Sequence, residues 1–134
     1  MNTFHHIGIF CKNLEFGKLE ISKFINIASM SNEIIDEGIG VRIIFLNDKQ
    51  GLKYELISPY GENNPVTGTL LRNKDYLNHI AYQTDSFDNE IIKLRNAGHV
   101  PLGAPKKAKA FQDSRVIFFL TPLGFIIELI EFNS

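Results

Sequence analysis

Two histidines and two glutamates of this chain are of the types that bind metal ions, and they recur at one fixed spacing. His6 lies in the stretch HHIGI, and His79 lies 73 residues later (79 − 6) in the similar stretch NHIAY. Glu55 and Glu128, also 73 residues apart (128 − 55), each interrupt an apolar stretch. A buried carboxylate without a partner is costly, so glutamates at such positions are usually paired or metal-bound. Two imidazoles and two carboxylates suit a borderline divalent ion such as Zn²⁺, Ni²⁺, Co²⁺, Mn²⁺ or Fe²⁺.

The same offset aligns the two halves of the chain beyond these four residues. Between positions 42 and 57, seven of the sixteen residues are identical to the residue 73 positions later, without a gap. Unrelated segments of this composition agree at roughly one position in 16. Arg42 matches Arg115 in this alignment, and Phe45 matches Phe118. The chain therefore contains two copies of one unit.

Each copy has the pattern β-α-β-β-β. Alternating apolar residues and β-formers predict strands, helical spacing predicts the helices, and Gly and Pro mark turns. In the first copy we expect a strand at 4–10, a helix at 14–26, a weak strand within 27–35, and strands at 41–46 and 53–58. In the second copy we expect a strand at 77–84, a helix from about 85 to 98, and strands at 99–102, 115–120 and 125–132. A turn-rich segment, 59–74, joins the copies, and 103–114 is expected to be irregular.

Strand alternation sorts the neighbours of each histidine by face. Side chains two residues apart share a face, so His6 lies beside Gly8, and His79 lies beside Ala81. Both neighbours are very small, which leaves room next to each imidazole. His5 lies on the opposite face of its strand and is not a predicted ligand.

The composition is that of a globular protein and limits its partners. The chain has 134 residues, is 44% hydrophobic and 22% charged, and carries a formal net charge of −1. This charge gives no reason to expect nucleic acid as a partner. No apolar run reaches the roughly 18 residues of a membrane span, and no signal peptide is visible. Cys11 is the only cysteine, which excludes an internal disulfide. We expect a cytoplasmic protein.

The repeat and its four chelating residues resemble the vicinal oxygen chelate superfamily, which includes glyoxalase I and methylmalonyl-CoA epimerase. The resemblance implies an α+β fold in which two β-α-β-β-β modules form a cupped, eight-stranded mixed sheet around a metal. It implies a single domain over 1–134, with module one at 1–66 and module two at 67–134. In this superfamily the first and last strands of each module each carry a ligand, which corresponds here to His6, Glu55, His79 and Glu128.

Several activities within the superfamily are compatible with these residues. The segment YELISPYGENNPVTGTLLRNKDYLNHIAY, at 54–82, resembles methylmalonyl-CoA epimerase between its second and third ligands. Bacterial glyoxalase I also uses a His, Glu, His, Glu set, so a lactoylglutathione lyase is the first alternative. The second alternative is a metal-containing protein that binds or modifies another metabolite.

The epimerase resemblance implies proton transfer at a carbon next to a carbonyl, through a metal-stabilised enolate. Glu128 and Glu55 are the expected catalytic residues, and Glu128 is the preferred base. With Arg42 where some epimerases carry an extra acid, a two-base mechanism would use these two glutamates. The expected partner is a small molecule such as an acyl-CoA or a glutathione adduct, bound by a homodimer. Candidate substrate-binding residues are Arg42, Arg115, Lys106, Lys107 and Phe111.

Overall fold

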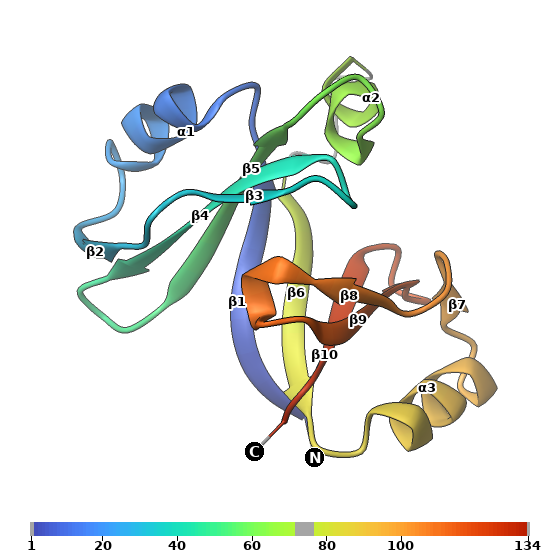
Figure 1. Cartoon of the computed structure of the whole chain (residues 1–134). Coiled ribbons are helices and arrows are strands. Elements are labelled where there is room, and N and C mark those ends of the chain that lie inside the picture. The colour runs from blue at the N-terminus through green and yellow to red at the C-terminus, as the bar shows by residue number, and fades with distance from the viewer. Residues whose placement is uncertain (1, 72–76, 134) are drawn as a thin grey trace. The chain divides into compact units, whose positions relative to one another are not determined.

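A computed structural model of the chain describes residues 2–71 and 77–133. These residues form an α+β fold with three α-helices and ten β-strands (Figure 1). The fold consists of two compact units, of which one is His6–Asn78. The other comprises the residues up to His5 together with those from His79 onward. None of the described helices is long and apolar enough to cross a membrane.

The first unit contains one complete copy of the repeat. Its strands follow the order β2-β4-β5-β1; β1 and β5 are parallel and the other pairs are antiparallel. The short strand β3 also pairs with β4. The elements are β1 (Asn2–Phe10), α1 (Leu14–Ile21), β2 (Ile27–Met30), β3 (Ile34–Asp36), β4 (Val41–Asp48), β5 (Lys53–Pro59) and α2 (Pro65–Leu71).

The second unit repeats this arrangement. Its strands follow the order β6-β10-β9-β7, with β6 and β10 parallel and β8 paired to β9. The N-terminal end of β1 belongs to this unit, where the Phe4 and Tyr82 rings meet edge to face. The elements are β6 (Leu77–Thr84), α3 (Phe87–Asn96), β7 (Val100–Pro101), β8 (Lys106–Ala108), the 3-10 turn η1 (Lys109–Phe111), β9 (Ser114–Leu120) and β10 (Ile126–Glu131).

The predicted fold class is confirmed, with small differences in the elements. Both copies have the β-α-β-β-β order, and the short strands β3 and β8 are additional to the eight expected. Helix α1 begins at Leu14, where the Asn13 Oδ1 accepts the Phe16 N–H at 2.7 Å. It ends at Ile21, well before the expected residue 26.

Helix α2 is an element that the sequence reading missed. It lies in the segment predicted to be only turns, and its Thr and Gly residues are weak helix formers. The signal for it was the pair Asn64-Pro65. The Asn64 Oδ1 accepts the N–H groups of Val66 and Thr67 at 2.9 and 2.8 Å, and Pro65 occupies the first helical position.

In both units the sheet has one face packed under a helix. Under α1 the buried cluster is Cys11, Leu14, Ile21, Ile44, Leu46 and Leu56. Under α3 it is Phe87, Ile117, Phe119 and Leu129. Fully burying one such Leu or Phe contributes about 1.5–3 kcal/mol, so these clusters determine which face of each strand turns inward. We call this side of each unit the helix face.

Candidate metal centre

In the first unit, His6 and Glu55 form a buried pair on the face opposite the helix. The His6 Nε2 lies 3.2 Å from the Glu55 Oε1, and the residues are 0% and 3% exposed. Glu55 is the parallel register partner of Gly8 on β1, so no side chain stands between the carboxylate and the imidazole two residues earlier. Phe45 lies on β4 and is the register partner of Glu55 on β5. Its ring meets the His6 ring edge to face at 5.7 Å.

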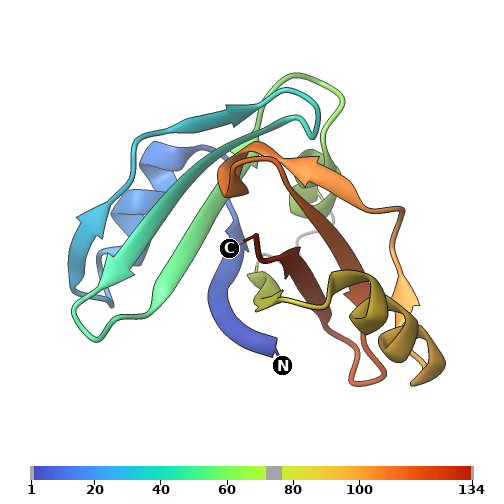
Figure 2. The same cartoon turned by 60° about the horizontal axis from the view of Figure 1, so that its bottom comes forward.

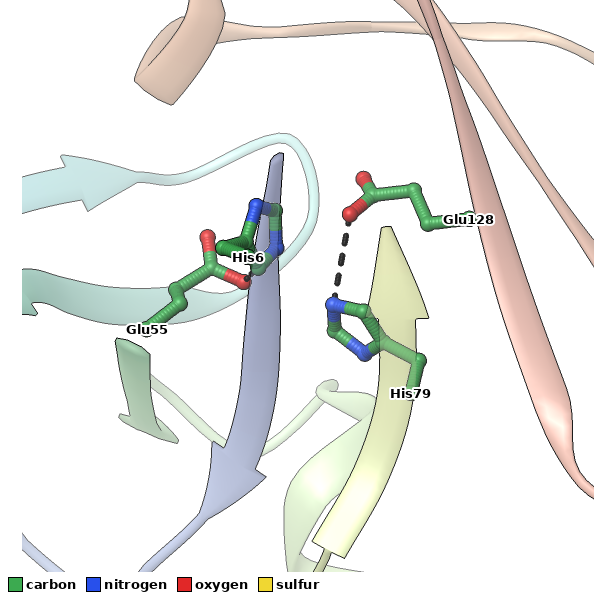
Figure 3. A group of neighbouring side chains, drawn as sticks. All are labelled: His6, Glu55, His79 and Glu128. Carbon is green, nitrogen blue, oxygen red and sulfur yellow. Dashed lines mark ion pairs between the residues drawn. The ribbon is translucent and has the colours of Figure 1, made fainter. Parts of the chain in front are cut away.

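The second unit repeats this arrangement residue for residue. The His79 Nε2 lies 3.2 Å from the Glu128 Oε1, and both residues are buried. Glu128 is the register partner of Ala81 on β6 and of Phe118 on β9. The Phe118 and His79 rings meet edge to face at 5.2 Å. Figure 3 shows the glutamate and histidine of each pair directed toward each other. We call the side that carries these pairs the His–Glu face.

The geometry of each pair fits two ligands of one divalent ion. Two ligand atoms that are each about 2.1 Å from an ion and at right angles lie about 3 Å apart. The measured separation of 3.2 Å is close to this distance in both pairs. All four residues are buried and belong to the types that hold metal ions. The donor set is therefore compatible with a borderline divalent cation.

The aromatic partners of the histidines were not among the predicted site residues. Phe45 and Phe118 each pack against one imidazole in an edge-to-face contact, and both histidines are buried. Their signal in the sequence was their identity at the 73-residue offset. In the structure, each phenylalanine is the register partner, on the neighbouring strand, of the glutamate of its own His–Glu pair. This shared position accounts for the identity of the two residues.

Arg42 was among the predicted substrate-binding residues, and the structure places its side chain on the face opposite to Glu55. It is the register partner of Ser58 on β5, so its side chain points to the helix face, opposite to Glu55. There its Nη1 lies 3.2 Å from the Glu33 Oε1, and its guanidinium stacks on the Tyr60 ring at 4.9 Å.

Arg115 occupies the equivalent place in the second unit. Its guanidinium lies over the Phe87 ring at 4.7 Å and binds Asp88 through two hydrogen bonds of 3.1 Å. It also binds Glu131 at 3.0 and 2.6 Å. The hydrogen bonds from Arg115 lower the pKa of both carboxyls. The structure therefore brings neither Arg42 nor Arg115 together with the histidines.

The three predicted residues of the 103–114 segment lie on and next to strand β8. Lys106 faces Val116 and so lies on the His–Glu face, whereas Lys107 faces Arg115 on the helix face. Both lysines are exposed. The Phe111 ring meets the His5 ring edge to face at 5.5 Å. The segment is thus more regular than expected, because β8 and η1 lie within it.

The residues of the candidate metal centre, His6, Glu55, His79 and Glu128, lie on two units that each have the β-α-β-β-β order. The family model of the Glyoxalase/Bleomycin resistance protein/Dioxygenase superfamily matches residues 5–118, and the chain belongs to this superfamily. No curated protein matches the sequence.

Solved structures of this fold include several methylmalonyl-CoA epimerases. The Mycobacterium tuberculosis epimerase has a TM-score of 0.78 at 21% identity, with 98% of this chain and 89% of that chain covered. A Streptomyces coelicolor epimerase variant in complex with 2-nitronate-propionyl-CoA has a TM-score of 0.77 at 24% identity, covering 100% and 97%. A hypothetical protein of Bacillus halodurans C-125 has a TM-score of 0.77 at 22% identity, covering 99% and 96%. At these identities the likeness shows the fold.

Proposed function

We propose that this protein is a divalent-metal-dependent epimerase or isomerase that moves a proton at the carbon next to the carbonyl of an acyl-CoA. The observation that carries the proposal is the buried His–Glu pair, present twice at equivalent positions of the repeat. The fold is shared with methylmalonyl-CoA epimerases, one of which was solved with an acyl-CoA analogue. That likeness favours an acyl-CoA over other carbonyl compounds.

The proposed metal ligands are His6, Glu55, His79 and Glu128, whose types and burial suit the site. Each histidine would bind through the Nε2 that faces its glutamate. When bound, a divalent ion supplies a Lewis acid that stabilises the negative charge developing on a carbonyl oxygen as the neighbouring carbon loses its proton.

The glutamates are the proposed proton carriers. Glu128 removes the proton from the carbon at one carboxylate oxygen, and Glu55 returns a proton to the other side of that carbon. A two-base change of configuration uses two such groups, and the repeat supplies one in each module. The rings of Phe45 and Phe118 hold the imidazoles in place and keep water from their edges.

A lactoylglutathione lyase is the second candidate, because the His, Glu, His, Glu set of this chain resembles that of bacterial glyoxalase I.

Three further expectations stay predictions: the boundaries of module one (1–66) and module two (67–134), the homodimer and the cytoplasmic location.

One experiment separates the two activities. The metal-loaded protein is incubated in D2O with one stereoisomer of methylmalonyl-CoA, and deuterium at the carbon between the carbonyls is followed by NMR. We expect incorporation together with loss of optical purity. A parallel reaction with methylglyoxal and glutathione tests for lactoylglutathione. Product only in the second reaction would replace the epimerase with the lyase, and product in neither would exclude both.

A further inference from the structure

Strand β2 is the outer strand of the first unit and has an open edge (Figure 1). It pairs with β4 on one side, and no other strand that the structure describes pairs with it. Ser31, directly after β2, donates its N–H to the Phe45 carbonyl on β4 at 2.8 Å. Because successive backbone groups of a strand point to opposite edges, the N–H and C=O of Met30 point away from β4. This edge therefore offers backbone hydrogen bonds to a further strand.

The equivalent edge of the second unit carries residues that block pairing. Its outer strand β7 is only two residues long and contains Pro101, which has no N–H to donate. Further along the same edge, Pro105 precedes β8, and Lys106 and Lys107 begin it. Proline and lysine on an edge strand are means by which proteins prevent the addition of another strand. The second unit is thus protected at this edge.

The edge at β2 lacks these protective residues. Segment 24–32, with the sequence FINIASMSN, contains no charged residue, no proline and no glycine. Phe24 and Met30 are 74% and 50% exposed. A β-bulge between Ile27 and Ser29 limits regular pairing to the part of the segment that follows it. Of two edges that are equivalent in the repeat, one is blocked and the other is suited to bind a strand.

Charges at the two ends of β2 indicate which strand fits. Lys23 precedes the segment, and Lys49 lies at the same end, because its N–H donates at 3.0 Å to the carbonyl of the residue before β2. Glu33 and Glu37 follow the other end, and all four residues are exposed. Lys23 and Glu33 have ion-pair partners within the unit, so Lys49 and Glu37 are the main charges for a partner. An antiparallel strand of the same sequence would place its glutamate end beside these lysines.

We propose that two copies of this chain pair through β2, antiparallel and about a two-fold axis at Met30. Each Met30 donates its N–H to the Met30 carbonyl of the other copy. The two methionine side chains then lie side by side on the helix face, where Met30 is the register partner of Leu46. Identical surfaces that meet about a two-fold axis close the assembly at two copies. The inference goes beyond the proposed function, because it concerns assembly and does not use the His–Glu face.

Sedimentation equilibrium of the full chain, over a range of concentrations, tests the proposal. The wild type should sediment as a dimer, at twice the 15.2 kDa mass of the chain. Met30→Lys and Met30→Glu should each weaken the dimer by at least about tenfold, because like charges meet at the two-fold axis. An equimolar mixture of the two variants should recover the dimer, because opposite charges then meet. This recovery separates loss of pairing from loss of folding.

Leu123→Lys is the matched control, since Leu123 is an 85% exposed leucine at the turn between β9 and β10. This variant should dimerise as the wild type does. A monomeric wild type would overturn the proposal, and so would a dimer that persists unchanged in both Met30 variants. A mixture of the two variants that stays monomeric would also overturn it, because the charges would then not meet across the axis.

Discussion

Glu128 on β10 lies directly across the parallel ladder from Ala81 on β6, the residue two positions beyond His79. Ala81 is fully buried, and its small side chain leaves the space through which the carboxylate reaches the imidazole. The first unit has the same relationship between Glu55 and Gly8. In both units, a small residue at this place leaves room for the carboxylate to reach the imidazole of its own pair.

Ala81→Leu should consequently damage the site more than the fold. Overpacking of this kind costs about 1–3 kcal/mol of stability, and the added branches would separate Glu128 from His79. We expect the affinity for Co²⁺ or Zn²⁺, measured by calorimetry, to fall by at least about tenfold. Ala28→Leu, at an exposed position of β2, is the control. A variant with wild-type metal affinity would show that the space beside Ala81 is not needed.

Metal removal should lower the thermal stability of the protein. A ligand that binds only the folded state stabilises it by about 2.7 kcal/mol at 100 times its Kd. The Tm of chelator-treated protein should therefore rise when Zn²⁺ or Co²⁺ is added back, as measured by calorimetry. His79→Ala should remove most of this rise. An equal rise in His79→Ala and in the wild type would place the ion elsewhere.

Glu128→Gln tests the proposed base. The amide keeps the size of the side chain but cannot accept the proton, so turnover should fall by about 10²-fold or more. The circular dichroism spectrum should be unchanged. Glu131→Gln is the control on the same strand, because Glu131 lies on the helix face with Arg115. Wild-type turnover in Glu128→Gln would remove this residue from the mechanism.

Gly17→Ala should destabilise the protein, because α1 packs closely against Cys11 and Leu56 at this position. A Cβ at Gly17 would lie 2.8 Å from the Cys11 Sγ and 3.2 Å from the Leu56 Cδ1. We expect a loss of about 1–2 kcal/mol in urea denaturation, despite the higher helix propensity of alanine. In a Cys11→Ala background the sulfur is absent, and Gly17→Ala should become neutral or stabilising. The same loss in both backgrounds would rule out the sulfur contact as the cause.

The Arg115 ion pairs should make stability depend on pH in a defined direction. Hydrogen bonds from Arg115 lower the pKa of Glu131 and Asp88, so their contribution is present above the ordinary carboxyl pKa of about 4. It disappears as the pH falls through the lowered pKa values. Arg115→Met should therefore reduce the Tm slightly at pH 7, and the difference should close in strong acid. The reduction is small because the Asp88 side chain is 73% exposed. A difference that widened in acid would contradict this assignment.

Much of the architecture could be predicted because its signals are local or repeated. The strand Leu77–Thr84 has its predicted bounds, and α3 (Phe87–Asn96) lies within the range expected for it. Helix α2 was missed because two signals in the sequence oppose each other. Asn64 indicates a helix start, whereas the Thr and Gly residues that follow disfavour a helix. The irregular 103–114 segment gains β8 only by pairing with β9, a partner that local sequence does not reveal.

The sequence by itself predicted the repeated β-α-β-β-β order and indicated the four residues of the candidate centre, because an offset of 73 residues preserves both strand pattern and residue type. Tertiary structure decided which face each side chain occupies. Register placed Arg42 and Arg115 on the helix faces. A shift of one residue reverses the face of every side chain in a strand, and register depends on pairing between distant segments. For that reason the separation of Arg42 from Glu55 became visible only in the folded chain.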